Sequence, residues 1–104
     1  MSAPANAARG EASLRIAGTE LVLRPSFAAL VAAEAELGPL FALVARAADQ
    51  QLTIAELATL FWCCLADRPE GLHRDAFNEG LAAQGIARLT PALKLLLGQI
   101  LGGR

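Results

Sequence analysis

The spacing of apolar residues predicts a β-hairpin near the start of this 104-residue chain. From Ala12 to Arg24 the apolar positions recur with period two on either side of a short break. They are Leu14, Ile16, Leu21 and Leu23. A period of two places these side chains on one face of a strand, and Gly18 can adopt the positive φ of a tight hairpin turn. We therefore expect a hairpin with one buried face, lying on helices.

The next residues predict a helix that begins directly after the hairpin. Pro25 disfavours further strand pairing, and the Ser26 hydroxyl can accept hydrogen bonds from first-turn amides. One side of this helix carries Phe27, Leu30, Val31, Glu34 and Leu37. We expect Phe27 to anchor the hairpin and the helix to one core. Gly38 should end the helix, and Pro39 suits the first turn of a second helix from Leu40 to Ala48.

A third helix is predicted to begin at Ile54, because Thr53 and Glu56 have the spacing of a capping box. Its apolar stripe comprises Ile54, Leu57, Ala58, Phe61, Cys64 and Leu65. Leu60 and Trp62 lie on the two flanks of this stripe, and a narrow polar back consists of Glu56, Thr59 and Cys63. A central helix that is apolar around most of its circumference is usually packed on several sides.

Two further helices follow a charged loop at residues 67–71. The fourth should run from about Arg74 to Gln84, facing inward through Phe77 and Leu81 and ending at Gly85.

Thr90 and Pro91 predict the start of the last helix, which Gly102 and Gly103 should close. Its apolar face comprises Leu93, Leu96, Leu97 and Ile100. Leu95 points the other way, so we expect it to be exposed in a monomer.

This order of elements predicts an α+β, mainly α fold, in which an N-terminal β-hairpin packs on a bundle of about five short helices. We assign residues 1–10 to a flexible N-terminal tail and residues 11–104 to one domain. The tail lacks the apolar run of a secretory signal, and the apolar run from Leu57 to Ala66 is shorter than the roughly 20 residues that a bilayer requires. We therefore expect a cytoplasmic protein without a membrane span.

The charges argue against nucleic-acid binding. Nine basic and ten acidic residues give a net charge of −1, and the basic residues form no run. A helix-turn-helix made of the third and fourth helices would carry Asp67, Glu70, Asp75 and Glu79, which would repel phosphates.

Candidate chemistry is sparse. Cys63 and Cys64 are adjacent in a helical pattern, so we expect free thiols in a reducing compartment. His73, the only imidazole, could pair with either thiol as a base, but no third orienting residue accompanies it. We therefore predict no enzyme, metal site, cofactor or small-molecule substrate. Glu34 is expected at the rim of the core, reaching solvent or pairing with an arginine such as Arg24 or Arg46.

Four apolar residues are candidates for binding a partner protein. Leu60 and Trp62 on the third helix could form such a surface, because aromatic residues often dominate binding energy, and the alternative is that both belong to the core. Leu95 and Leu101 belong to an amphipathic terminal helix that could dock on its own domain, on a second copy or in a groove of another protein.

The hairpin-to-helix junction carries a resemblance to a known family. The run Leu23-Arg24-Pro25-Ser26-Phe27-Ala28-Ala29-Leu30 is followed by Glu34, by Leu37-Gly38 and later by an Ile/Leu/Leu/Trp helix. This pattern, from about Glu11 to Leu101, resembles small tail proteins encoded by gene transfer agents and related tailed phages of alphaproteobacteria.

The resemblance implies a non-enzymatic role in tail assembly. Members of the family are described as tail tube components or as tail assembly chaperones, cytoplasmic proteins that bind the tape-measure protein while the tube polymerises. Tail tubes are generally built from β-rich subunits, so the predicted helices favour the chaperone. The alternatives are a structural tail subunit retained in the particle, a small helical adapter and a thiol enzyme. The implied partners are the tape-measure protein, other tail proteins or a second copy of the chain.

Overall fold

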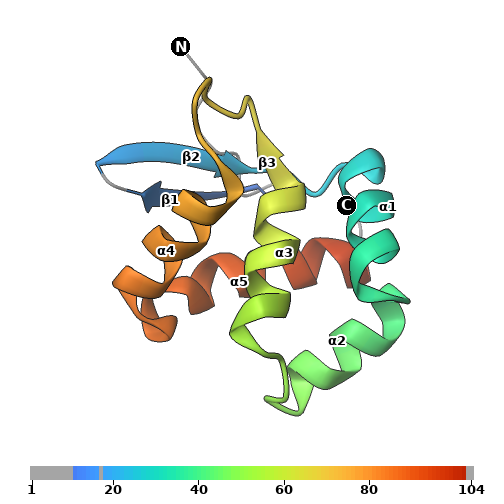
Figure 1. Ribbon diagram of the computed structural model, residues 1–104. Helices are drawn as coiled ribbons and strands as arrows, with labels where there is room; N and C mark the ends of the chain where they lie inside the picture. The colour runs from blue at the N-terminus through green and yellow to red at the C-terminus, as the bar shows by residue number, and fades with distance from the viewer. Residues whose placement is uncertain (1–10, 17, 103–104) are drawn as a thin grey trace.

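The computed structural model describes residues 11–16 and 18–102, and the tail expected at residues 1–10 lies outside this part. Its elements are β1 (Ala12–Ile16), β2 (Thr19–Leu23), α1 (Phe27–Leu37), α2 (Leu40–Ala48), α3 (Ile54–Cys64), β3 (Leu65–Ala66), α4 (Arg74–Gln84) and α5 (Ile86–Gly102). Figure 1 shows the sheet above the helices, with α3 in the middle of the helical layer. The predicted α+β, mainly α class is confirmed.

The sheet contains the predicted hairpin and one strand that the sequence analysis missed. β1 and β2 are antiparallel, with Leu14 opposite Leu21. β3 pairs with the other edge of β2, and the Arg24 N–H extends this pairing by donating to the Cys64 carbonyl at 2.7 Å. A strand of two residues is too short to show a periodicity. The sequence analysis therefore placed Leu65 on the third helix, which was wrong because α3 ends at Cys64.

The predicted N-terminal caps of α1 and α3 are confirmed. The Ser26 hydroxyl accepts a hydrogen bond from the Ala29 N–H at 3.2 Å. At the start of α3 the Thr53 hydroxyl accepts from the Glu56 N–H at 3.1 Å, and the Glu56 carboxylate accepts from the Thr53 N–H at 3.0 Å. This reciprocal pair fixes where α3 begins, because it satisfies two backbone donors that the helix itself leaves unbonded.

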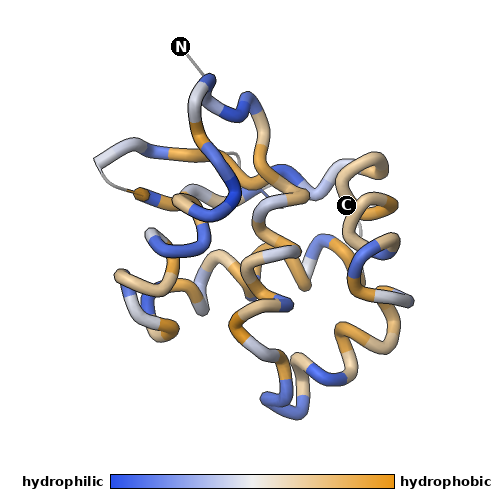
Figure 2. Tube along the Cα trace, viewed as in Figure 1, coloured by the Kyte–Doolittle hydropathy of each residue, from blue (hydrophilic) through white to orange (hydrophobic). Residues whose placement is uncertain are grey.

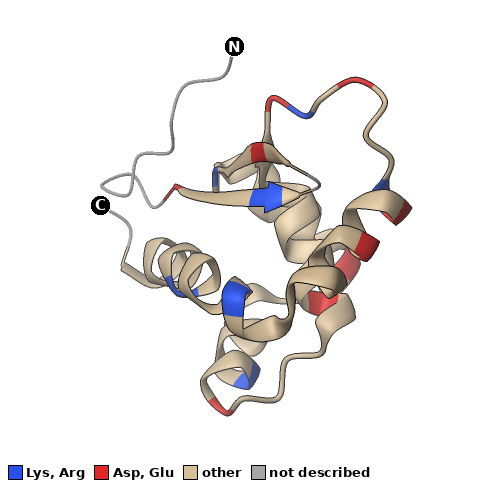
Figure 3. Ribbon diagram, turned by 90° about the vertical axis from the view of Figure 1, so that its left-hand side faces the viewer, with Lys and Arg blue, Asp and Glu red and all other residues tan. Residues whose placement is uncertain are grey.

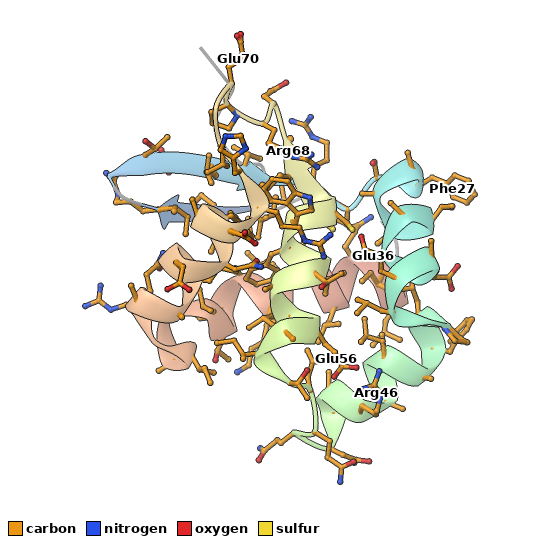
Figure 4. All side chains as sticks on the ribbon, viewed as in Figure 1. Phe27, Glu36, Arg46, Glu56, Arg68 and Glu70 are labelled. Atoms are coloured by element: carbon orange, nitrogen blue, oxygen red, sulfur yellow. The ribbon has the colours of Figure 1, made fainter. Side chains whose placement is uncertain are left out.

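The predicted inward face of α1 is confirmed for Leu30 and Leu37, which pack against the core, and is wrong for Phe27 and Val31. Ala29 and Ala33 are buried, whereas Phe27 is 84% exposed and Val31 is 48% exposed. α1 packs on α3, and small side chains allow two helix backbones to approach closely. The alanine face therefore occupies the contact, and Phe27 does not anchor the core but points away from the molecule (Figure 4).

A sharp corner separates α1 from α2. Gly38 adopts a φ of 86°, and its N–H donates to the Glu34 carbonyl at 2.9 Å. Glu34 is exposed, which agrees with the expectation that it reaches solvent, and its carboxylate caps α2 by accepting from the Leu40 N–H at 3.0 Å. Within the described residues no single helix is long and apolar enough to cross a membrane, and only α1 and α2 together pass that test, bent by 78°.

The last helix begins earlier than predicted. α5 starts at Ile86 and contains Pro91 in its interior, although Thr90 and Pro91 were expected to open it. The Thr90 hydroxyl donates to the Ile86 carbonyl at 3.3 Å, and the fully buried Leu89 anchors the turn before the proline. Core packing thus outweighs the backbone hydrogen bond that proline cannot make. Gly102 is the last residue of α5, and Gly103 lies outside the described residues.

One core lies between the sheet and the helices. Its largest fully buried side chains are Phe61, Phe77, Leu23, Leu43, Leu60, Leu81, Leu89, Leu96 and Cys64. Helix α4 approaches β1 so closely that a Cβ atom on Gly80 would lie 2.5 Å from the Cγ2 atom of Ile16. A glycine is required at this crossing because no side chain fits there.

Candidate partner-binding surface

The four predicted partner-binding residues occupy different environments. Leu60 has no exposed surface, so in this conformation it cannot contact a partner. It belongs to the core, so for Leu60 the core interpretation is confirmed. Trp62 is partly buried, with its ring 5.4 Å from the Phe77 ring and 4.1 Å from the Arg68 guanidinium. These contacts place Trp62 at the edge of the core, beside the loop that follows α3.

The two residues on α5 are exposed. Leu95 is 39% exposed, as predicted for a monomer, and Leu101 is 64% exposed. Leu101 lines a pocket, whereas Leu95 lines none of the pockets found among the described residues. The structure therefore does not bring the four candidates together, and it directs attention to the surface around Leu101.

Two apolar pockets follow the same pair of helices. One, of about 460 Å³, lies where the end of α2 and the start of α3 face α5. The other, of about 250 Å³, lies where α1 and the start of α2 face the end of α5. We call the surface that contains both pockets the α2–α5 groove. Its walls are formed on α2 by Leu40, Phe41, Val44, Ala47 and Ala48, and on α5 by Ile86, Thr90, Leu93, Lys94, Leu97, Ile100 and Leu101.

The sequence analysis missed most of the α2 wall, although a signal for it was present. Its residues occupy positions 40, 41, 44, 47 and 48, which is the spacing of one helix face. Leu43 is the buried residue of α2 and lies at the edge of this face, beside Leu40 and Ala47, whereas Phe41 is 88% exposed. Apolar residues predominate along α2 in Figure 2. One sequence pattern could have identified this wall. It is a short amphipathic helix that has more apolar residues than its contact with the core requires.

Polar side chains on the other side of α3 join neighbouring helices. Arg74 of α4 donates to the Glu36 carboxylate of α1 at 2.9 Å and to the Thr59 hydroxyl of α3 at 3.0 Å. The hydrogen bonds from Arg74 hold the pKa of Glu36 below its usual range. Arg46 of α2 forms an ion pair with Glu56 of α3, which is visible at the lower edge of Figure 4.

A further ion pair closes the open end of the hairpin. Glu11, directly before β1, is only 3% exposed, and the Arg24 Nε atom directly after β2 lies 2.7 Å from its carboxylate. The hydrogen bond to Glu11 raises the pKa of Arg24. This pair supports the hairpin against the helices, so its role is structural.

The thiols and the imidazole form no reactive arrangement in the described part of the chain. Cys63 and Cys64 are free, and burial raises the pKa of the Cys64 thiol to about 12 and also raises that of Cys63. His73 is exposed at the start of α4, and no hydrogen bond joins it to either thiol among residues 11–16 and 18–102. The same residues contain no group of three or more His, Cys, Asp or Glu side chains placed to hold a metal ion.

The geometry defines a small helical domain with an apolar surface groove. A comparison with protein families identifies the family of this domain. The family model described as phage tail tube protein, GTA-gp10, matches residues 9–103. The chain therefore belongs to this family, and it is a phage tail protein. No curated protein and no solved structure matches the chain.

Proposed function

We propose that this tail protein is a non-enzymatic tail assembly chaperone, which binds the tape-measure protein in the bacterial cytoplasm while the tail tube forms around it. The observation that carries the proposal is the amount of apolar surface that the fold leaves exposed. The exposed large apolar residues are Phe27, Val31, Phe41, Ile54, Ile86, Leu95 and Leu101. Of these, Phe41 and Leu101 line one pocket and Ile54 and Ile86 line another, and apolar surface gathered in this way marks a site where another protein binds.

The helical architecture supports a chaperone over a tube subunit. The described residues form strands of five, five and two residues, and the remaining elements are helices. A ring subunit of a β-rich tube needs long strands that pair with neighbouring subunits. A chaperone has a different requirement, since it must cover amphipathic segments of its partner reversibly, and apolar helix surfaces do this without backbone pairing.

Co-expression with the tape-measure protein tests the proposal. We expect the tape-measure protein to remain in the soluble fraction and to co-purify with the chain, compared with expression alone. The control is an unrelated soluble helical protein of similar size. A tape-measure protein that is equally insoluble with and without the chain would contradict the chaperone role.

Purified particles test the alternative of a structural subunit. A chaperone leaves the tube when assembly is complete, so we expect mass spectrometry of purified particles to find far fewer copies of this chain than of the major tail protein. Detection of both proteins in similar amounts would establish a retained subunit. It would contradict a chaperone that leaves the tube when assembly is complete.

Thiol labelling tests the non-enzymatic part of the proposal. At a pKa of about 12, only about one in ten thousand Cys64 thiols is ionised at pH 8. We expect native Cys64 to react with a thiol reagent at least a hundredfold more slowly than in the denatured chain. A native thiol that reacts faster than a free cysteine would instead support an activated nucleophile.

A further inference from the structure

We propose that the α2–α5 groove binds one amphipathic helix of the partner chain, with apolar side chains entering the groove and carboxylates along its flanks. This inference rests on the proposed function and assigns it a surface and a chemistry. It commits to a segment of another protein, and a helix of a second copy is an outcome that the test distinguishes.

The dimensions of the groove suit a helix. α5 has 17 residues and is therefore about 25 Å long, and the groove follows it from Ile86 to Leu101. Both walls are helix faces whose apolar side chains recur every three or four residues, so ridges on a bound helix can enter the spaces between them. About four turns of helix would span this length.

The chemistry of the walls favours a helix over an extended peptide. The groove is lined by side chains of α1, α2, α3 and α5 and of the turn before α3, and the helix backbones satisfy their own N–H and C=O groups. No strand edge of the described sheet lies in the groove lining. An extended peptide would therefore bury backbone groups without partners, whereas a helix satisfies these groups internally.

The charges of the groove walls indicate which charged residues should lie along the flanks of the bound helix. α2 and α5 carry no acidic residue, and of their three basic residues Arg46, Arg88 and Lys94 only Lys94 lines either pocket (Figure 3). Arg46 is already paired with Glu56, whereas no ion pair among the described residues involves Lys94. Lys94 is the only charged residue that lines the larger pocket. A partner helix with a carboxylate at this point would gain an ion pair next to apolar contacts.

Photo-crosslinking identifies what occupies the groove in cells that assemble tails. Phe41 in the groove wall and Phe27 outside the groove have similar exposed fractions of 88% and 84%, so they form a matched pair for replacement by benzoylphenylalanine. We expect position 41 to crosslink to a helical, acid-flanked segment of the tape-measure protein at least fivefold more often than position 27. A crosslink from position 41 to a second copy of this chain, or equal labelling from both positions, would overturn the proposal.

Substitutions in the full-length chain separate this inference from the proposed function. In the co-expression assay we expect Phe41→Ser to lower the yield of soluble tape-measure protein about tenfold and Lys94→Glu to lower it about threefold. The matched controls Phe27→Ser and Arg88→Glu should match the wild type. If the wild type keeps the tape-measure protein soluble and both groove variants do so equally well, the groove assignment is wrong while the chaperone role stands. If the wild type fails, both proposals fall.

Circular dichroism shows whether the variants are comparable. Phe41 is almost fully exposed, and Lys94 forms no ion pair among residues 11–16 and 18–102, so both variants should unfold within a few degrees of the wild type. A reversed charge on the partner supplies the final check. Replacing an acidic residue of the crosslinked tape-measure segment by lysine should restore the yield of soluble tape-measure protein with Lys94→Glu. If no acidic residue of the segment does so, the ion pair with Lys94 is rejected.

Discussion

The polar back of α3 and the α2–α5 groove are two regions that differ in the contacts their side chains make. On the polar back, Glu56 pairs with Arg46 of α2, and Thr59 accepts from Arg74 of α4, which also binds Glu36 of α1. In the groove, Lys94 forms no ion pair among the described residues, and the walls are mainly apolar. Charged side chains thus connect helices to one another, whereas the groove exposes apolar side chains, such as Phe41 and Leu101, that the core leaves uncovered.

The comparison separates residues that hold the fold from residues available to a partner. Side chains that connect three helices contribute to the stability of the domain. The most exposed side chains of the groove, Phe41 and Leu101, are not part of the core, so a partner can cover them at little cost to the fold. We therefore expect substitutions on the two sides to affect different measurements, namely stability on one side and binding on the other.

The largest expected difference lies between two phenylalanines. Phe61 has no exposed surface, so Phe61→Ala should lower the free energy of unfolding by about 3–5 kcal/mol. Phe41 is 88% exposed, and Phe41→Ala should change it by less than about 0.5 kcal/mol. Urea denaturation of both variants measures the difference. Equal losses would mean that the groove wall is part of the core.

A smaller difference is expected between two helical glycines. A Cβ atom on Gly80 would lie 2.5 Å from the branched side chain of Ile16, whereas one on Gly98 of α5 would meet nothing within 4 Å. We expect Gly80→Ala to destabilise the chain by about 1–3 kcal/mol and Gly98→Ala to stabilise it by up to about 1 kcal/mol. Thermal unfolding of the pair tests whether α4 meets β1 as closely as described. A stabilised Gly80→Ala variant would contradict that contact.

The smallest expected effect is a change in how the stability of the chain depends on pH. Because Arg74 lowers the pKa of Glu36 from its ordinary value of 4.5, the folded state favours the ionised carboxylate. This contribution to stability is present above about pH 4.5 and is lost as the pH falls through the lowered pKa of the folded state. Arg74→Gln should therefore weaken the dependence of the urea midpoint on pH between pH 5 and pH 3.

The control for this prediction is Arg88→Gln, because Arg88 forms no ion pair among the described residues. The dependence that remains in Arg74→Gln should come partly from Glu56, whose pKa is lowered first by the Thr53 backbone N–H and then by Arg46. An unchanged pH dependence in Arg74→Gln would show that its ion pair with Glu36 contributes nothing measurable.

Features that depend on a few neighbouring residues could be predicted from the sequence. The Ser26 cap, the capping box of Thr53 and Glu56, and the positive φ of Gly38 and Gly85 all follow from local chemistry. The hairpin register likewise follows from a two-residue period that places Leu14 opposite Leu21. Such features need no knowledge of which elements pack together, so the bounds of the helices before the last one agreed closely with the structure.

Features that depend on packing could not be predicted in the same way. Hydrophobicity favoured Phe27 as the buried residue of α1, yet the contact with α3 selects the smaller Ala29 and Ala33. Pro91 is a good first residue of a helix, but the buried Leu89 draws the preceding turn into α5. The groove was missed for the same reason. The sequence does not show whether an apolar helix face is covered, because this depends on how the neighbouring elements pack.

The single fully buried residue of α2 has a consequence for how the chain opens. Leu43 is the only fully buried residue of this nine-residue helix, and Gly38 and Gln50, both with positive φ, lie just outside its two ends. Elements with few buried contacts undergo local unfolding at a lower free energy than the whole domain. Amide hydrogens of α2 should therefore exchange with deuterium before those of α3, and a bound segment that covers α2 should slow this exchange.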